Sequence, residues 1–97
     1  MPLFVMSAID KPHSLALRLA TREAHFAYAR ETGVIRLGGP FLDDNADMAG
    51  SLIIFEAADL AAARAWHEGD PYKKAGLFAT SEVRPWKATF NACDAKL

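Results

Sequence analysis

The segment VIRLGGPFLDDNADMAGSLIIFEA, residues 34–57, contains two apolar runs separated by a polar connection. The runs over residues 34–41 and 51–57 are rich in Val, Ile, Leu and Phe, which favour strands. The Asp, Asn and Gly content of the connection is typical of a hairpin loop. The segment therefore predicts two neighbouring antiparallel strands.

A predicted helix flanks this hairpin on each side. On the N-terminal side, residues 14–32 contain no glycine or proline and are rich in Ala, Leu, Arg and Glu, with Ser14 as the expected N-cap. Gly33 follows directly, as expected for the residue that ends a helix. On the C-terminal side, Asp59 can cap a second helix over residues 60–68.

Two further strands complete the pattern. Residues 3–9, LFVMSAI, form a compact apolar run that ends shortly before Pro12. Residues 77–90, LFATSEVRPWKATF, form the last strand, and Pro85 indicates a sheet edge or a bulge because proline cannot donate a ladder hydrogen bond. The element order βαββαβ predicts a ferredoxin-like α+β fold with a four-stranded antiparallel sheet.

The predicted sheet has one face that two helices cannot cover. The strands over residues 34–41 and 51–57 are too apolar for a face left in water. We therefore expect a homodimer in which the two sheets pack against each other.

Length, charge and cysteine content limit the kinds of protein that this sequence can encode. The 97 residues suffice for one modest core, so we expect a single domain over residues 1–97. The net charge is -1 with basic residues scattered among acids, which gives no reason to expect a nucleic-acid partner. The apolar N-terminal run is too short for a signal sequence or a membrane span. A single cysteine, Cys93, cannot form an internal disulfide and favours a cytoplasmic protein.

The helix over residues 14–32 has an apolar side and a cationic side. At about 100° per residue, Leu15, Leu19 and Phe26 share one narrow sector, so we expect them in the core. The cationic side carries a titratable group and consists of Arg18, Arg22 and His25.

The three histidines differ in their sequence surroundings. His25 has two arginines on its helix face, and spacing alone leaves two alternatives for it, a partly exposed surface residue or a functional group. His13 precedes a helix and His67 ends one, where a cation suits the helix dipole. We expect both on the surface.

Gly38, Gly39 and Pro40 stand together at a predicted strand end. Two glycines remove side chains where another group must come near the backbone, and that group is either a ligand or a neighbouring chain. No helix follows, which argues against a phosphate-binding loop. No cysteine or histidine pair has metal-ligand spacing, so we predict neither a metal site nor a cofactor.

Several residues recur in a familiar order along the chain. They are Arg22-x-x-His25-x-x-Tyr28, Gly33, Gly38-Gly39-Pro40, Gly50-Ser51, Asp70-Pro71-Tyr72, Ala75-Gly76-Leu77-Phe78 and Trp86. With this order the sequence resembles the YciI-like (YCII-related) family over nearly its whole length. The combination of the helix histidine with the Asp-Pro turn is the most specific part of the resemblance.

The resemblance implies a ferredoxin-like fold that dimerises as an α+β barrel, with a His and an Asp in the cleft of each subunit as an active-site pair. His25 and Asp70 occupy those positions here. Most members of the family have no established reaction, although one similar protein is a dehydrochlorinase acting on a chlorinated hydroxyhydroquinone. The family therefore indicates a site more firmly than a reaction.

His25 and Asp70 are accordingly the candidate catalytic residues. The rigid Pro71 can hold Asp70 at a helix end, where the carboxylate would orient the His25 ring and stabilise its protonated form. The candidate substrate-binding residues are Arg18, Arg22, Gly39, Pro40 and Ser51.

Two functions are open at this point. The first is general acid/base catalysis of an elimination, an isomerisation or a proton abstraction on a small aromatic or enolic molecule. The alternative is a non-catalytic accessory module that binds a small molecule or an anion in the same cleft.

Overall fold

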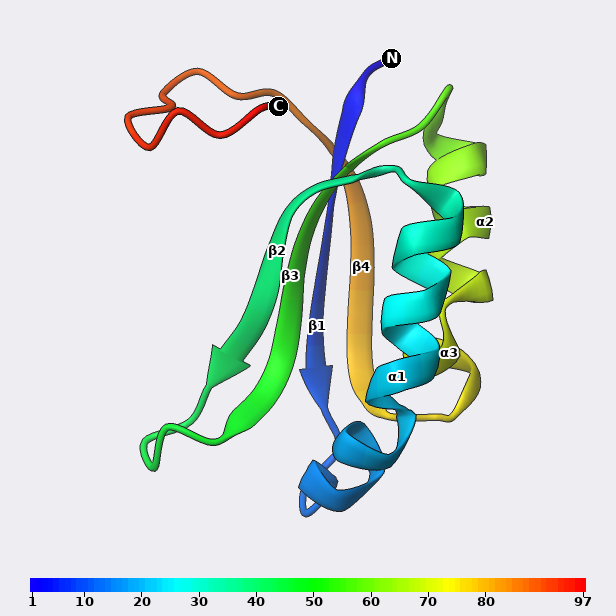
Figure 1. The fold of residues 1–97 in the computed structure, drawn as a ribbon, viewed down its shortest axis with the longest axis vertical. Coiled ribbons are helices and arrows are strands. Elements are labelled where there is room, and N and C mark those ends of the chain that lie inside the picture. The colour runs from blue at the N-terminus through cyan, green and yellow to red at the C-terminus, as the bar shows by residue number, and fades with distance from the viewer.

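The computed structural model describes residues 1–97 and confirms the ferredoxin-like α+β fold, with one short helix that the sequence pattern did not predict (Figure 1). None of the helices is both long and apolar enough to span a lipid bilayer. The elements are β1 (Leu3–Asp10), α1 (Leu15–Thr32), β2 (Ile35–Leu42), β3 (Met48–Glu56), α2 (Leu60–Gly69), α3 (Pro71–Lys74) and β4 (Phe78–Trp86).

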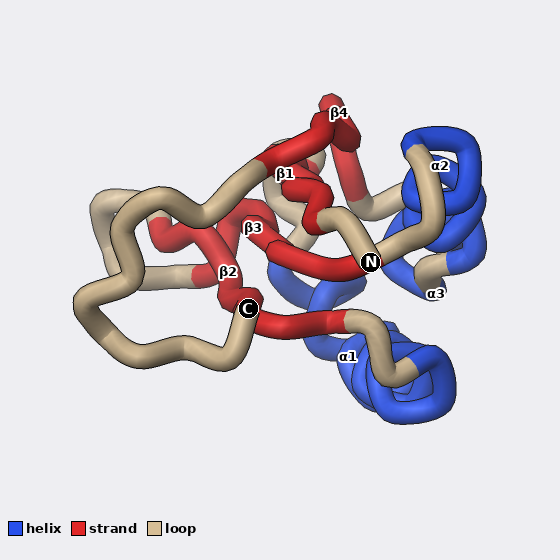
Figure 2. The backbone as a smooth tube through the Cα atoms, turned by 90° about the horizontal axis from the view of Figure 1, so that it is seen from above, coloured by secondary structure: helices blue, strands red, loops and turns tan.

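The four strands form one antiparallel sheet in the order β2-β3-β1-β4. The hairpin of β2 and β3 lies on one side of β1, and β4 lies on the other, so β4 is an edge strand as Pro85 indicated. Figure 2 shows all the helices on one side of this sheet. The opposite side is the open face.

The helix ends follow the local sequence signals with one exception. Gly33 is left-handed, with a φ of 63°, and its N–H donates to the carbonyl of Ala29. The Asp59 carboxylate accepts a hydrogen bond of 2.8 Å from the N–H of Ala62. Ser14 occupies the predicted N-cap position of α1, but its side chain does not cap the helix, because its hydroxyl donates to the carbonyl of Pro12 instead.

The core lies between the sheet and the helices. Alternate residues of β1 and β3 point toward the helices, and these positions are buried: Phe4, Met6 and Ala8 in β1, and Ile53 and Phe55 in β3.

Asp10 and Ser51 continue these two alternations toward one end of the sheet. Both are buried polar residues on the helix side. Gly50 lets the strands meet there, because an added Cβ would lie 2.4 Å from the carbonyl oxygen of Ala8. The apolar core therefore gives way to a polar region at this end.

Helix α1 turns a different face inward than the one predicted. Arg18 is 3% exposed, whereas Leu19 is 49% and Phe26 is 39% exposed in the single chain. The prediction that Leu19 and Phe26 are core residues is therefore wrong, and Arg18 from the cationic side of the helix is buried instead. Arg18 can be buried because Asp10, on the neighbouring strand, neutralises it.

The end of α2 is more buried than its sequence suggested. Trp66 and His67 are both buried, with His67 only 4% exposed. The surface position expected for His67 is therefore wrong. The ring is placed beside β4, where its Nε2 lies 2.9 Å from the hydroxyl of Ser81.

The open face of the sheet carries large apolar side chains. Ile9, Leu37 and Leu52 are 51%, 49% and 39% exposed. In β1 and β3, Ile9 and Leu52 stand between helix-facing residues, so their side chains point to the open face. Leu37 of β2 pairs with Ile54, which also stands between helix-facing residues, so Leu37 points to the open face as well. The chain by itself thus leaves apolar area in contact with water on this side.

Candidate active site

A cavity of about 290 Å³ lies between α1, the hairpin strands β2 and β3, and α3. Every candidate substrate-binding residue lines it, as does His25, while Asp70 lies behind the His25 ring. The predicted residues that line the cavity are Arg18, Arg22, His25, Gly39, Pro40 and Ser51.

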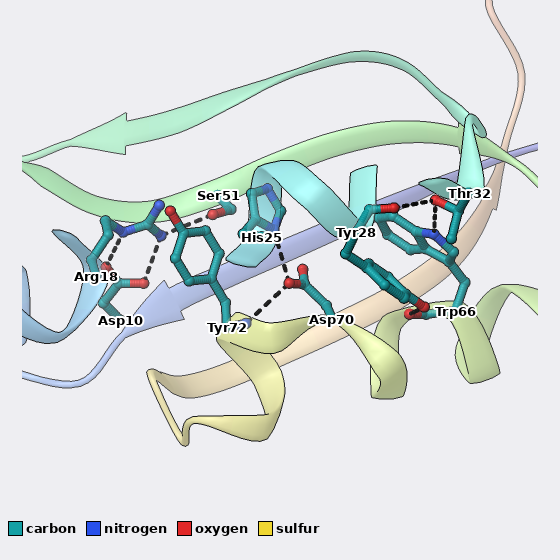
Figure 3. A network of polar contacts seen from close by, with 9 residues as sticks. All are labelled: Asp10, Arg18, His25, Tyr28, Thr32, Ser51, Trp66, Asp70 and Tyr72. Atoms are coloured by element: carbon teal, nitrogen blue, oxygen red, sulfur yellow. Dashed lines mark hydrogen bonds and ion pairs between the residues drawn. The ribbon is translucent and has the colours of Figure 1, made fainter. Parts of the chain in front are cut away.

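His25 and Asp70 are in direct contact (Figure 3). Nδ1 of His25 lies 2.8 Å from Oδ1 of Asp70, and the backbone N–H of Tyr72 donates to the same oxygen at 3.0 Å. The Asp70 side chain is fully buried and that of His25 is 11% exposed. Nδ1 of His25 is thereby occupied, and Nε2 makes no hydrogen bond to the protein.

Asp70 owes its position to the junction of α2 and α3. Its backbone is extended, with φ −64° and ψ 127°, and Pro71 begins α3 directly after it. The Asp70 carboxylate then caps α3 through the N–H of Tyr72. Oδ1 of Asp70 therefore both caps the start of α3 and holds His25.

The Gly69–Tyr28 contact sets the distance between α1 and α2. A Cβ added to Gly69 would lie 2.5 Å from the Tyr28 hydroxyl, which donates to the carbonyl of Trp66 at 2.7 Å. Burial and the charge of Asp70 both raise the pKa of Tyr28, so its hydroxyl stays protonated as a donor at neutral pH. This contact brings the helix that carries His25 against the turn that carries Asp70.

The Tyr72 ring lies between His25 and Arg18. It stacks on the His25 ring with 4.3 Å between centroids and an interplanar angle of 18°, and the Arg18 guanidinium carbon lies 4.8 Å from its centroid. Burial raises the pKa of the Tyr72 hydroxyl, and the charge of Arg18 offsets part of that increase. Tyr72 therefore holds both neighbouring side chains in place and keeps a neutral hydroxyl on the cavity wall.

The guanidinium of Arg18 forms hydrogen bonds with other side chains of the protein. It donates to the two carboxylate oxygens of Asp10 at 2.7 and 2.9 Å and to the Ser51 hydroxyl at 2.8 Å. Burial alone would lower the pKa of Arg18, but the hydrogen bond and charge of Asp10 raise it above its usual value. Arg18 is thus a fixed positive charge in the cavity wall, neutralised by Asp10.

Asp10 is the residue of this region that the sequence pattern did not identify. It lies at the end of β1, in alternation with the core residues Met6 and Ala8. That alternation was the available signal, since an acid at an inward position needs a buried cationic partner.

Arg22 lines the cavity without forming an ion pair. It is exposed, makes no ion pair, and holds its guanidinium carbon 5.4 Å from the centroid of Phe26. Of the two arginines that line the cavity, only Arg22 can therefore bind an added anion without breaking an internal salt bridge.

Gly39 and Pro40 form the sheet side of the cavity. A Cβ added to Gly39 would meet nothing within 4 Å, whereas one on Gly38 would lie 3.3 Å from the carbonyl oxygen of Leu52. Gly38 therefore serves the close pairing of β2 and β3. Gly39 lines the cavity with its backbone, but it pairs with Leu52 of the open face, so the free space beside its Cα lies on that face, where a neighbouring chain can approach. No group of three or more His, Cys, Asp or Glu side chains is placed to hold a metal ion.

The fold and the site together define a class of small α+β proteins in which a buried carboxylate holds a histidine at a cavity between the long helix and the sheet. The chain belongs to the YCII-related family, whose domain it matches over residues 2–87. Protein YciI of Escherichia coli O6:H1 is 38% identical over 97 residues, which cover 91% of this chain and 99% of that protein. An uncharacterised protein of Haemophilus influenzae is 36% identical over 96 residues, covering 90% and 98%.

A solved structure with the same fold has a named activity. The 5-chloro-2-hydroxyhydroquinone dehydrochlorinase TftG of Burkholderia phenoliruptrix AC1100, in complex with 2,5-dihydroxybenzoquinone, is 40% identical with a TM-score of 0.79. The match covers 88% of this chain and 93% of that one. An antibiotic biosynthesis monooxygenase has a TM-score of 0.58 at 16% identity, over 91% and 98% of the two chains, and shows the fold alone.

Proposed function

We propose that the protein is an enzyme that removes a proton from a small aromatic or enolic molecule and so promotes an elimination, with His25 as general acid/base. The hydrogen bond from His25 Nδ1 to the buried Asp70 carries this proposal. Because the carboxylate accepts the Nδ1 proton, the lone pair on Nε2 is left to accept a proton from a molecule in the cavity. Asp70 then stabilises the imidazolium that forms.

The similarity to TftG supports a dehydrohalogenation. In this reaction His25 takes the proton of one hydroxyl of a halogenated hydroquinone, the oxygen electron pair forms a carbonyl, and the ring carbon that bears the halogen gains a proton. A second hydroxyl then loses its proton and forms the other carbonyl of the quinone, and the carbon–halogen bond breaks to release halide. The net change is the loss of one hydrogen halide. The cavity of about 290 Å³ suits one substituted ring, since a cavity of about 150 Å³ can bind benzene.

A turnover assay tests the proposed function. The protein is incubated with chlorinated hydroxyhydroquinones and with the same compounds lacking chlorine, and released chloride and quinone absorbance are measured. We expect chloride release that is proportional to protein concentration. Mass spectrometry of the bound fraction detects the alternative: a compound retained without conversion would identify a non-catalytic binding module and would contradict the proposal.

Arg22 is expected to bind the anionic oxygen of the substrate. Replacing it by glutamine should raise KM about three- to tenfold with a small change in kcat, because a contact with a partly exposed charge is worth roughly 1 kcal/mol. Steady-state kinetics measure both constants. Arg30→Gln removes an exposed cation of α1 that does not line the cavity, so it should leave KM unchanged. An equal KM for the two variants would exclude Arg22 from substrate binding.

We further propose that two copies of the chain pack through the open faces of their sheets. The exposed Ile9, Leu37 and Leu52 support this assembly, because burying them would remove an apolar surface from water. The helices lie on the opposite side of the sheet, so this packing would leave α1 accessible (Figure 2).

Substitution of Leu52 by lysine tests the assembly. It places a charge in the proposed interface and should convert a dimer into a monomer at low micromolar concentration, as measured by light scattering. Leu19→Lys is the matched control, because Leu19 is similarly exposed but belongs to α1. A monomeric wild-type protein under these conditions would refute the proposed dimer.

A further inference from the structure

A second cavity, of about 520 Å³, lies between α2, α3 and the edge strand β4. It shares no lining residue with the His25 cavity, and most of its lining side chains are polar or charged. They are Arg64, His67, Glu68, Lys73, Ser81, Glu82, Val83 and Arg84.

The two cavities lie on different sides of α3. Tyr72 lines the first cavity, and its neighbour Lys73 lines the second. On β4, Ser81 pairs with Ala8, which is buried on the helix side of the sheet. Ser81 therefore faces the helices, away from the open face that we propose as the dimer contact.

Three hydrogen-bonding groups converge on the wall of the second cavity. Nε2 of His67 lies 2.9 Å from the Ser81 hydroxyl oxygen, and Nζ of Lys73 donates to the same oxygen at 3.4 Å. Nδ1 of His67 is buried and has no partner, so Ser81 is the only group that the His67 ring contacts by a hydrogen bond. Such a group of a hydroxyl, an imidazole and an ammonium is suited to hold an oxyanion.

The charges around the second cavity favour a negative ligand. Arg84 forms an ion pair with Glu82, whereas Arg64 and Lys73 make no ion pair. Glu68 is the one carboxylate of the lining without a salt bridge. The unpaired charges of Arg64, Lys73 and Glu68 therefore sum to a positive value.

The environment of His67 agrees with this charge balance. Burial lowers the pKa of His67, and the positive charge of Lys73 lowers it further, while Asp70 and Glu68 act in the opposite direction. An anion bound next to Lys73 would supply negative charge near the ring. Its arrival would therefore raise the pKa of His67.

We propose that this second cavity binds the phosphate or carboxylate group of a small metabolite, held by Lys73, Ser81 and His67 with Arg64 beside them. The volume exceeds that of a single oxyanion, which leaves room for the remainder of the molecule. The site is independent of the proposed elimination, because none of its residues belongs to the His25 cavity.

Inorganic phosphate and acetate serve as separate probes, at constant ionic strength held with sodium chloride. The NMR signals of the His67 ring are followed as either anion is added and as the pH is varied. We expect a saturable shift with at least one of the two, together with a higher pKa of His67 in its presence. Phosphate alone would assign a phosphate group, and acetate alone a carboxylate.

Matched lysine variants make the test specific. Lys73→Ala should weaken anion binding about tenfold or more, since a hydrogen bond to a charged group is worth about 1.5–3 kcal/mol. Lys74→Ala removes an exposed lysine of the same short helix that does not line the cavity, so it should bind as the wild type does. Arg22→Gln should also leave the response unchanged, because Arg22 lies in the other cavity.

Two results would overturn the proposal. In the first, neither anion shifts the His67 signals more than those of the exposed His13. In the second, Lys73→Ala and Lys74→Ala bind the anion equally well, which would mean that binding occurs elsewhere on the surface.

Discussion

Replacing His25 by alanine is expected to lower kcat for halide release by about 10²- to 10⁴-fold, the usual contribution of a general acid/base. The variant removes the group that receives the substrate proton and leaves Asp70 without its ring partner. Steady-state assays with a chlorinated hydroxyhydroquinone measure the change. Circular dichroism and urea unfolding establish that the variant is folded.

Control variants test whether the loss of activity is specific to His25 or follows from replacing another histidine. His13 is exposed and left-handed, with a φ of 59°, so asparagine is the suitable replacement because it tolerates that conformation. His13→Asn should keep full activity. Asp70→Asn should lower kcat because it removes the carboxylate charge that stabilises the imidazolium. Unchanged turnover in a folded His25→Ala protein would exclude the proposed role.

The largest expected change in stability comes from Asp10. Its replacement by asparagine leaves the guanidinium of Arg18 buried without a compensating charge. Breaking a buried ion pair in this way costs about 3–5 kcal/mol, a large part of the roughly 5–15 kcal/mol that stabilises a typical domain. Urea unfolding should show a lower free energy of unfolding.

A double variant tests whether the loss of stability comes from the missing ion pair itself or from the uncompensated charge of Arg18. Asp10→Leu combined with Arg18→Met replaces the buried ions by apolar side chains of similar size, and it should recover most of the stability. Glu82→Gln breaks the exposed pair with Arg84 and should cost less than about 1 kcal/mol. If Asp10→Asn were as mild as Glu82→Gln, the Arg18 charge would have to be solvated rather than buried.

The ion pair between Arg18 and Asp10 also gives different roles to the two arginines that line the cavity, Arg18 and Arg22. The sequence offered both Arg18 and Arg22 as candidate substrate-binding residues. In the folded chain Arg18 is bound to Asp10 and Ser51, and Arg22 has no ion-pair partner. A substrate anion is therefore expected to contact Arg22, with Arg18 shaping the cavity wall.

The sequence by itself determined the order of the elements and most of their ends. These features depend on neighbouring residues: the hairpin on two apolar runs around a polar connection, the end of α1 on the left-handed Gly33, and the start of α2 on the Asp59 cap. Local signals of this kind were sufficient for the ferredoxin-like fold. They were insufficient for the short helix α3, because four residues leave too little periodicity to detect.

Only the tertiary structure decided which charged side chains are buried. Periodicity placed Leu19 and Phe26 of α1 in the core, but Arg18 is buried in their stead because Asp10, on another element, neutralises it. His67 is buried in the same way beside Ser81 of β4. The contact of His25 with Asp70 joins residues 45 positions apart, and family resemblance rather than spacing suggested it. The physical reason is common to all three: burying a polar or charged group is favourable only when a partner compensates its lost hydration, and the position of a distant partner is a property of the folded chain.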